Sequence, residues 1–260
     1  MAKPSYFYGI HAVQSILQHR GIDGLTLFIQ DGKKQDDATV ANITELAQTY
    51  GIAIQISAKD KLTKLAESPQ HQGVVLQARP AELQDEADLK YLVDKHQAER
   101  KPLLLLVLDQ ITDPNNLGAC LRTAVAMGVS AVIIPKNHSS SITPAVAKVA
   151  VGAVELMPFI QVTNLARTLT DIKKQGVFVF GTALDDTAKP VQDCDLTGDV
   201  AIVMGSEGDG IRRLTADTCD QLVYIPMPGN EHGQIQIQSL NVSVATGMVL
   251  YEASRQRSRK

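Results

Sequence analysis

The sequence predicts two consecutive α/β domains, and three observations support this interpretation. Helical patterns alternate with strand-like apolar segments through most of the 260 residues. In the second half the apolar runs are continuous, which is typical of strands buried on both faces of a parallel sheet. Between the halves, residues 81–101 hold six acidic and four basic residues and few aliphatic ones. We therefore expect an N-terminal domain over residues 1–80, a partly helical linker over 81–101 and a second domain over 102–260.

The N-terminal domain is predicted as a small α/β unit. Helical patterns are expected at residues 11–18, 38–50 and 62–67, and strands at 25–29, 53–56 and 73–77. In the second of these helices, Val40, Ile43 and Ala47 recur at helical spacing. Gly51 follows at the position where a left-handed residue commonly ends a helix.

The second domain is predicted from five stronger apolar runs. Strands are expected at residues 103–108, 131–134, 177–180, 200–204 and 222–225. Helical patterns lie at residues 117–127, 144–151, 165–175 and about 240–257. The chain ends in a basic cluster, and composition alone favours a solvated, frayed tail for its members, which are Arg255, Arg257, Arg259 and Lys260.

Composition excludes several classes of protein. A hydrophobic fraction of 44% with a net charge of −3 excludes a wholly disordered chain. The longest wholly apolar run, Leu103 to Leu108, has six residues, whereas a membrane-spanning helix needs about 20. The first residues show no apolar signal segment, and the three cysteines form no C-x-x-C pair. We expect a cytoplasmic protein without membrane spans, disulfides or a zinc site.

Three loops of the second domain stand out as candidate binding segments. Ligands of open parallel sheets bind beyond the carboxyl ends of the strands. After the first, fourth and fifth predicted strands come residues 109–118, residues 205–210, and residues 226–229 with Ser239 to Asn241 beyond them. Each loop alone could be an ordinary turn or helix cap. Together they place three polar, glycine-containing loops at one sheet edge, which predicts a binding site.

The common nucleotide and hydrolase motifs are absent. The segment Gly205 to Gly210 reads G-x-x-G-x-G, which is not the dinucleotide pattern, and no G-x-x-x-x-G-K-[ST] occurs. No serine lies in G-x-S-x-G, and no pair of histidines has helical metal-ligand spacing. Chemistry through a covalent nucleophile or a bound metal is therefore unsupported.

Three segments of the second domain resemble the motifs of the SpoU (TrmH) family of SPOUT methyltransferases. They are Asn116-Leu-Gly-Ala-Cys-Leu-Arg122, then Val203-Met-Gly-Ser-Glu-Gly-Asp-Gly210, then Ile225-Pro-Met with Ser239-Leu-Asn-Val-Ser-Val-Ala245. In the first domain, Tyr8 to Val13 and His71 to Val75 resemble the small RNA-binding domain of bacterial 23S rRNA guanosine-2′-O-methyltransferases. The resemblance covers nearly the entire chain.

The resemblance implies a fold, a cofactor and a set of site residues. The family fold is an α/β sheet with a deep trefoil knot, its members are homodimers, and S-adenosylmethionine is the methyl donor. By matching positions, the expected cofactor-binding residues are Gly205, Ile225 and Leu240. The expected catalytic residues are Asn116, Arg122, Glu207, Ser239 and Asn241, and no metal is implied.

The motif arginine, Arg122, has two possible roles. In the family proposal it removes the proton of the ribose 2′-hydroxyl. An arginine side chain is an awkward base at neutral pH, because it keeps its proton there. Alternatively, it binds the target phosphate bidentately and polarises the hydroxyl. Asn116 and Ser239 would then orient Arg122, the ribose or the phosphate, while Glu207 would brace the loops.

The chain departs from the family pattern before its last motif. Residues 230–238 make the connection to Ser239 about six residues longer than in the family. We expect a mobile loop over the mouth of the cofactor site, or equally an insertion without a role, since surface insertions cost little free energy.

The expected function is S-adenosylmethionine-dependent methylation of the ribose 2′-hydroxyl of a guanosine in 23S rRNA, by a homodimer. Two alternatives stay open. One is a 2′-O-methyltransferase that acts on tRNA or on another rRNA nucleotide, and the other is an inactive RNA-binding or ribosome-assembly protein on the same fold.

Overall fold

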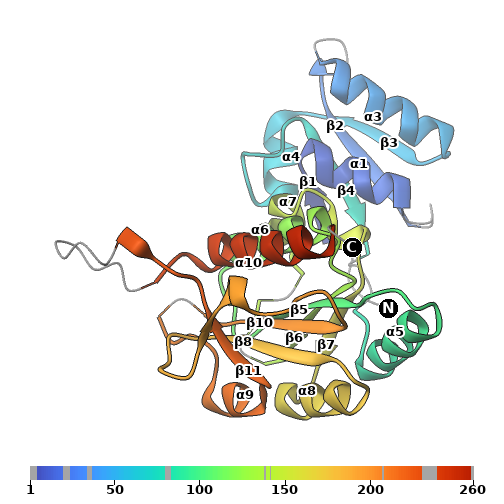
Figure 1. The fold of residues 1–260 in the computed structure, drawn as a ribbon. Coiled ribbons are helices and arrows are strands. Elements are labelled where there is room, and N and C mark those ends of the chain that lie inside the picture. Colours follow the sequence, from blue (N-terminus) through green and yellow to red (C-terminus); the bar gives the residue numbers. More distant parts are fainter. Residues whose placement is uncertain are drawn as a thin grey trace. The chain divides into compact units, whose positions relative to one another are not determined.

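A computed structural model describes residues 5–19, 24–33, 37–79, 83–137, 139–140, 142–206, 208–229 and 239–258. The chain forms two compact units (Figure 1). The first unit comprises Met1–Glu82 and Ser141–Leu156, and the second comprises Leu83–Ser140 and Met157–Lys260. No helix of the described residues is both long enough and apolar enough to cross a membrane.

The first unit is built on a four-stranded sheet with the order β1-β4-β2-β3. Strand β4 runs antiparallel to both β1 and β2, whereas β2 and β3 are parallel. The strands are β1 (Ser5–Tyr8), β2 (Thr26–Gln30), β3 (Ala53–Ser57) and β4 (Val74–Ala78). The helices that the structure describes within residues 1–80 are α1 (Ile10–His19), α3 (Ala38–Thr49) and α4 (Lys59–Ala66). The predicted helices and strands of this region are confirmed, and β1 is an additional strand that the sequence pattern did not predict.

The central strands β2 and β4 are buried on both faces of this sheet. Side chains alternate between the faces of a strand, so Leu27 and Ile29 pack in one core with α1 and α3, while Phe28 packs in the other with Leu62 of α4. Asp37 caps α3, because its side chain accepts hydrogen bonds from the backbone N–H groups of two residues in the first turn. The cap and the two cores explain why these segments form helices.

A segment from the middle of the chain completes the first unit. Helix α7 (Pro144–Val149) places Ala147 in the core beneath α1. The Ser15 hydroxyl donates to the carbonyl of Gly152 at 3.0 Å, and Lys148 Nζ donates to Gln70 Oε1 at 2.8 Å. A Cβ at Gly152 would overlap the Ser15 side chain, so the close approach requires glycine. The helix was predicted, but these contacts place it with the first unit rather than with the rest of residues 102–260.

The second unit is built on a seven-stranded sheet with the order β7-β6-β5-β10-β8-β11-β9, and all its paired strands are parallel. The strands are β5 (Leu104–Leu108), β6 (Ala131–Pro135), β7 (Phe159–Val162), β8 (Phe178–Thr182), β9 (Lys189–Pro190), β10 (Val200–Met204) and β11 (Gln221–Tyr224). The five predicted strands are confirmed. The sequence pattern did not predict β7 and β9, which have four and two residues.

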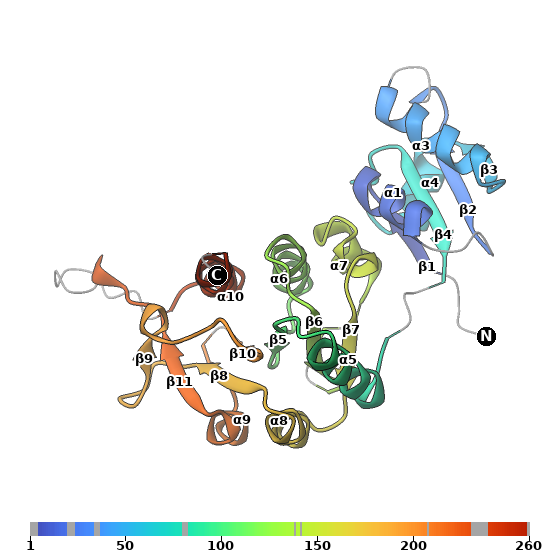
Figure 2. The ribbon, with the colours of Figure 1, turned by 45° about the vertical axis from the view of Figure 1, so that its right-hand side comes forward.

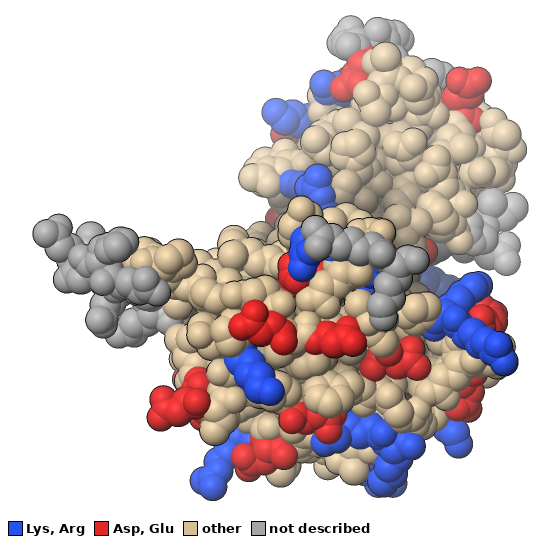
Figure 3. All heavy atoms as spheres, in the orientation of Figure 1, with Lys and Arg blue, Asp and Glu red and all other residues tan. Residues whose placement is uncertain are grey.

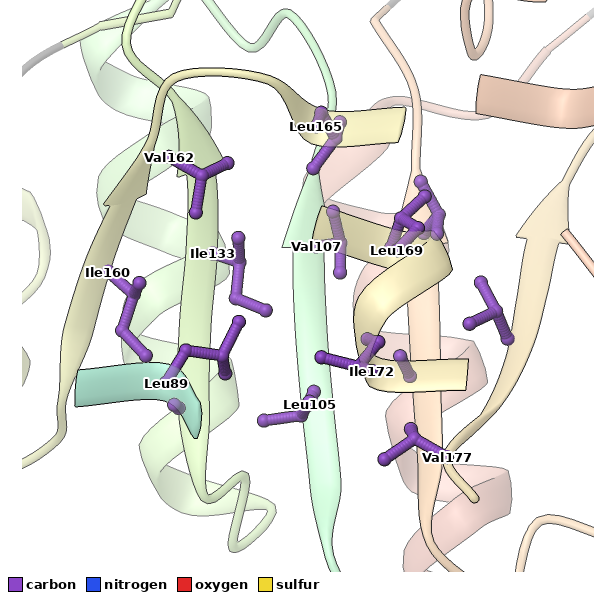
Figure 4. Packing of buried hydrophobic residues seen from close by; sticks show 14 of the residues in the cluster. Leu89, Leu105, Val107, Ile133, Ile160, Val162, Leu165, Leu169, Ile172 and Val177 are labelled. Atoms are coloured by element: carbon purple, nitrogen blue, oxygen red, sulfur yellow. The ribbon is translucent and has the colours of Figure 1, made fainter. Parts of the chain in front are cut away.

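Helices cover both faces of this sheet (Figure 2). On one face lie α6 (Pro114–Ala126) and α10 (Val242–Arg257), which pack against each other. On the other face lie α5 (Glu86–Ala98), α8 (Leu165–Lys174) and α9 (Arg213–Thr218). Figure 4 shows the core beneath α5 and α8, where Leu89 and Leu169 pack on Leu105, Val107 and Ile133 of the sheet. Most of the predicted linker is therefore a helix of this unit.

The end of α10 differs from the expected solvated tail. The Arg257 Nε donates to the carbonyl of Leu196 at 2.9 Å, and its Nη2 donates to the carbonyls of Leu103 at 3.0 Å and Gly198. Arg255 forms an ion pair with Glu252 at 2.6 Å. The prediction of a frayed tail is wrong for Arg255 and Arg257, because the end of α10 reaches backbone carbonyls before β5 and β10. Residues 259–260 lie outside the described residues.

Candidate functional site

The three loops singled out in the sequence lie at one edge of the second sheet. Strands β5, β10 and β11 belong to one set of parallel strands, with β5 beside β10 and β8 between β10 and β11. Their carboxyl ends therefore point the same way. The predicted meeting of the three loops at one sheet edge is confirmed.

A cavity of about 390 Å³ opens at this edge. Its lining comes from residues within four stretches of chain, at 182–185, 204–211, 222–227 and 239–245, and from Ala216. Gly205, Ile225 and Leu240, the three expected cofactor-binding residues, all line this cavity, and so does Ser239. Most of the wall is apolar side chain and backbone. The volume and character of the wall are typical of a small-molecule site.

The loop after β10 forms a tight turn along one wall of the cavity. Ser206 and Gly210 pair through two backbone hydrogen bonds, at 3.0 and 3.1 Å. A Cβ at Gly205 would overlap the backbone of Gly210 and Ile211. The glycine is therefore required by the closure of the loop on itself. The expected catalytic residue Glu207 belongs to this loop but lies outside the described residues.

Two expected catalytic residues are joined beside the cavity. Asn241 is the N-cap of α10, and its Oδ1 accepts a hydrogen bond from the backbone N–H of Ser243 at 3.0 Å. Its Nδ2 donates to Asn116 Oδ1 on α6 at 3.0 Å. The neighbours of Asn241 on both sides, Leu240 and Val242, line the cavity. Within the third candidate loop, the residue that caps α10 is therefore Asn241.

The structure does not bring Arg122 into the cavity wall. Arg122 lies on the exposed side of α6, and its side chain has no hydrogen bond or ion pair to any other described residue. The guanidinium is therefore available to a partner molecule. The predicted cover loop at residues 230–238 lies outside the described residues.

Asp109, directly after β5, contacts the cavity wall through Met204, and sequence reasoning named it only as the start of a loop. Its side chain is fully buried and pairs with Arg212, which follows the loop along the cavity wall. The only local signal is an acidic residue directly after six apolar ones.

The cysteines do not offer a reactive thiolate. Burial raises the pKa of Cys120 to about 11 and that of Cys219 to about 12. Both side chains are therefore neutral thiols near pH 7. Among the described residues, no three His, Cys, Asp or Glu side chains gather in a way that could hold a metal ion.

The second unit matches a known protein family. The sequence profile described as the SpoU rRNA Methylase family matches residues 103–251, more than half of the chain. The chain belongs to the SpoU rRNA methylase family. A second profile, described as RNA 2′-O ribose methyltransferase substrate binding, matches residues 6–84. The two profiles together cover nearly all of this SpoU protein.

Relatives of this SpoU protein match it over almost their whole length. It is 53% identical over 258 residues to the 23S rRNA (guanosine-2′-O-)-methyltransferase RlmB of Acinetobacter baylyi, covering 99% of both chains. It is 45% identical to RlmB of Vibrio vulnificus, covering 97% of both chains.

Two solved structures share the fold. AviRb, the SpoU methyltransferase of Streptomyces viridochromogenes in complex with the cofactor AdoMet, matches with a TM-score of 0.75 at 23% identity, covering 98% of this chain and 91% of AviRb. A structure of an RNA 2′-O ribose methyltransferase matches with a TM-score of 0.75 at 25% identity, covering 97% and 88% of the two chains.

Proposed function

We propose that this protein transfers the methyl group of S-adenosylmethionine to the ribose 2′-hydroxyl of a guanosine in 23S rRNA. The observation that carries this proposal is a cavity lined by residues of the second and third SpoU motifs, with Asn116 of the first motif hydrogen-bonded to Asn241 beside it. The chain is similar to RlmB proteins along its whole length. Because ribosomal RNA is the substrate, we place the reaction in the cytoplasm.

Gly205, Ile225 and Leu240 hold the cofactor in this proposal. Bound S-adenosylmethionine supplies an electrophilic methyl group on a sulfonium. The chain supplies a concave site in which apolar side chains such as Leu222 and Ile225 exclude water, while backbone groups near Gly205 orient the ligand. The cavity volume of about 390 Å³ lies within the range of sites for molecules of this kind.

Asn116, Ser239 and Asn241 form the catalytic side beside the cavity, with Glu207 and Arg122. The hydrogen bond between Asn241 and Asn116 fixes both amides at the point where α6 and α10 begin. Holding the ribose oxygen in line with the methyl group can supply much of the rate enhancement. The exposed Arg122 binds an RNA phosphate and polarises the hydroxyl, since a guanidinium in water keeps its charge and offers a bidentate fork.

The first unit recruits the RNA in this proposal. It matches the substrate-binding profile of ribose methyltransferases. On the face of the second unit that Figure 3 shows, basic and acidic side chains of the described residues are interspersed. RNA contacts on that face therefore depend on individual side chains rather than on one broad basic surface.

A homodimer is supported by an apolar stripe on α10. Val244, Met248 and Tyr251 are 53%, 45% and 63% exposed and recur at the spacing of one helix face. Such a stripe on a surface helix indicates a protein interface. We propose that a second copy of the chain covers it, and that the C-terminal segment forms the trefoil knot of the family.

Two measurements test the proposed function. Isothermal titration with S-adenosylmethionine should show one site per chain, and mapping of ribose methylation should show one guanosine of 23S rRNA that loses its methyl group in cells lacking the protein. Loss of methylation in tRNA or at another rRNA nucleotide would show that the protein is a 2′-O-methyltransferase with a different RNA substrate. Absence of cofactor binding would leave an RNA-binding protein without methyltransferase activity.

A further inference from the structure

Asp109 is a buried carboxylate that the proposed chemistry does not use. It follows β5 directly, and its side chain is completely buried. Its backbone N–H donates to the carbonyl of Met204, the last residue of β10, at 2.8 Å. The residue is therefore fixed at the start of the glycine loop that borders the cavity.

Arg212 meets this carboxylate from the other end of the same loop. Its backbone N–H donates to Asp109 Oδ2 at 3.0 Å, its Nε donates to Oδ1 at 2.8 Å, and its Nη2 lies 2.7 Å from Oδ1. A buried carboxylate requires this kind of pairing, because an unpaired charge away from water is very unfavourable. Asp109 thus binds both ends of the loop from Gly205 to Ile211.

The loop from Gly205 to Ile211 requires stabilising contacts from residues outside it. Gly208 and Gly210 both adopt positive φ angles, of 91° and 68°, so its backbone is one that few other residues can follow. Within the described residues of the loop, its own closure consists of the Ser206–Gly210 pairing. Asp109 also begins the segment that leads to Asn116 at the start of α6. One carboxylate therefore connects the cofactor wall to the catalytic side.

We propose that Asp109 and Arg212 are positioning residues for methyl transfer, which set the glycine loop of the cofactor cavity relative to the segment that carries Asn116. The inference rests on the proposed function. Its specific consequence is that weakening the pair reduces cofactor affinity while the affinity for RNA is unchanged.

The chain offers a matched control pair at the opposite edge of the same sheet. Asp220 Oδ2 accepts a hydrogen bond from the backbone N–H of Val179 at 2.8 Å, near the start of β8. Lys173 Nζ lies 2.9 Å from Asp220 Oδ1. This pair also combines a carboxylate, a cation and a strand backbone, but neither of its residues lines the cavity. The Asp220 side chain is 26% exposed, so this pair controls for the loss of a carboxylate–cation contact at a strand end rather than for the burial of Asp109.

The test compares Asp109→Asn, Arg212→Lys and Arg212→Ala with Asp220→Asn and Arg213→Ala. Arg213 is a suitable neighbour control because its side chain is 96% exposed. Circular dichroism and thermal melting establish that each variant is folded.

We expect Asp109→Asn and Arg212→Ala to raise the Kd for S-adenosylmethionine at least tenfold, with a KM for an in vitro 23S rRNA transcript within twofold of wild type. Arg212→Lys should recover part of the loss, since it keeps the charge without the planar fork. The two controls should leave both constants unchanged.

Several outcomes would overturn the inference. If folded Asp109→Asn protein binds S-adenosylmethionine as tightly as wild type, the Asp109–Arg212 pair is only a structural ion pair. The same conclusion follows if Asp220→Asn loses as much cofactor affinity as Asp109→Asn. If Asp109→Asn does not fold, a Kd for Arg212→Lys equal to that of wild type overturns it as well. Wild-type protein is titrated in parallel, and its failure to bind S-adenosylmethionine would instead refute the proposed function.

Discussion

Asn116 and Asn241 lie 125 residues apart in the sequence and are joined side chain to side chain by a hydrogen bond of 3.0 Å. Each lies in the first turn or at the cap of a helix, α6 for Asn116 and α10 for Asn241. Asn241 uses its oxygen to cap α10 and its nitrogen to contact Asn116. One amide therefore serves both the stability of a helix and the alignment of two motifs, and the two roles can be separated by substitution.

Asn241→Ser should separate the two roles. Serine still caps a helix well but is too short to reach Asn116, so we expect stability close to wild type and a clear loss of methyl transfer. Asn241→Ala should lose the activity and also about 1 kcal/mol of stability, the usual value of an N-cap. Urea unfolding and single-turnover methyl transfer measure the two effects. Equal stability of the serine and alanine variants would contradict a capping role for Asn241.

Gly205→Ala should weaken cofactor binding through the loop itself. The added Cβ would overlap the backbone of Gly210 and Ile211, so the turn must open and the cavity wall must move. We expect the Kd for S-adenosylmethionine to rise at least about tenfold, which corresponds to about 1.4 kcal/mol. Gly198→Ala is the matched control, because a Cβ there meets no atom within 4 Å. Undiminished binding by the Gly205 variant would remove this loop from the site.

The fold was predictable where burial leaves a strong pattern in the sequence. Strands β5 and β10 are covered on both faces, so their sequences are unbroken apolar runs. Strand β7 has four residues and includes the polar Gln161, too short a segment for a periodicity to emerge. The membership of α7 in the first unit depends on contacts such as Lys148 with Gln70, which are 78 residues apart. Local patterns contain no information about such pairings.

The site was predictable to the extent that it lies in motifs. Gly205, Ile225 and Leu240 were expected together from the resemblance, and they line one cavity. Asp109 was missed because its partner Arg212 is 103 residues away, and the pairing follows only once β5 and β10 are known to be neighbours. Gly205 was expected as a cofactor-binding residue, whereas the structure shows that the backbone of the loop itself requires glycine at this position.

Replacing Arg122 should abolish chemistry without loss of cofactor binding. Arg122→Lys keeps the charge but loses the planar fork that holds a phosphate, so it should not restore activity. We expect methyl transfer to fall at least about a hundredfold in Arg122→Lys and Arg122→Ala, a loss of roughly 2.7 kcal/mol in transition-state stabilisation. Arg167→Ala is the control, since its side chain is 82% exposed on a helix outside the cavity lining. Near-normal rates in the Arg122 variants would leave Arg122 without a catalytic role.

Arg257→Ala should destabilise the second unit. The guanidinium bridges the carbonyls of Leu103, Leu196 and Gly198, and burial lowers its pKa from the ordinary value. Its removal leaves these acceptors without their partner, at a cost of about 2 kcal/mol. Thermal melting should show a lower midpoint for Arg257→Ala. Arg255→Ala removes only a partly buried ion pair with Glu252 within the same helix, so it should lower the midpoint less. Equal midpoints for the two variants would show that Arg257 does not anchor α10.

His71 should make the stability of the first unit depend on pH. Its Nδ1 accepts a hydrogen bond from the backbone N–H of Gly73 at 3.1 Å, which requires the neutral ring. Burial, followed by the positive charges of Lys59 and Lys148, lowers the pKa of His71 below its ordinary value of 6.5. The unfolded chain therefore binds a proton at a higher pH than the folded chain does, so stability rises with pH in this range.

The contribution of His71 should be complete above about pH 6.5 and should be lost progressively as the pH falls from there through the lower pKa of the folded state. Its slope cannot exceed about 1.4 kcal/mol per pH unit, the limit for one proton. Hydrogen exchange of the β4 amides, corrected for the intrinsic dependence on pH, reports on this unit directly. In His71→Asn the dependence below about pH 6.5 should flatten, because asparagine does not titrate. The same slope in wild type and variant would assign the dependence to other groups.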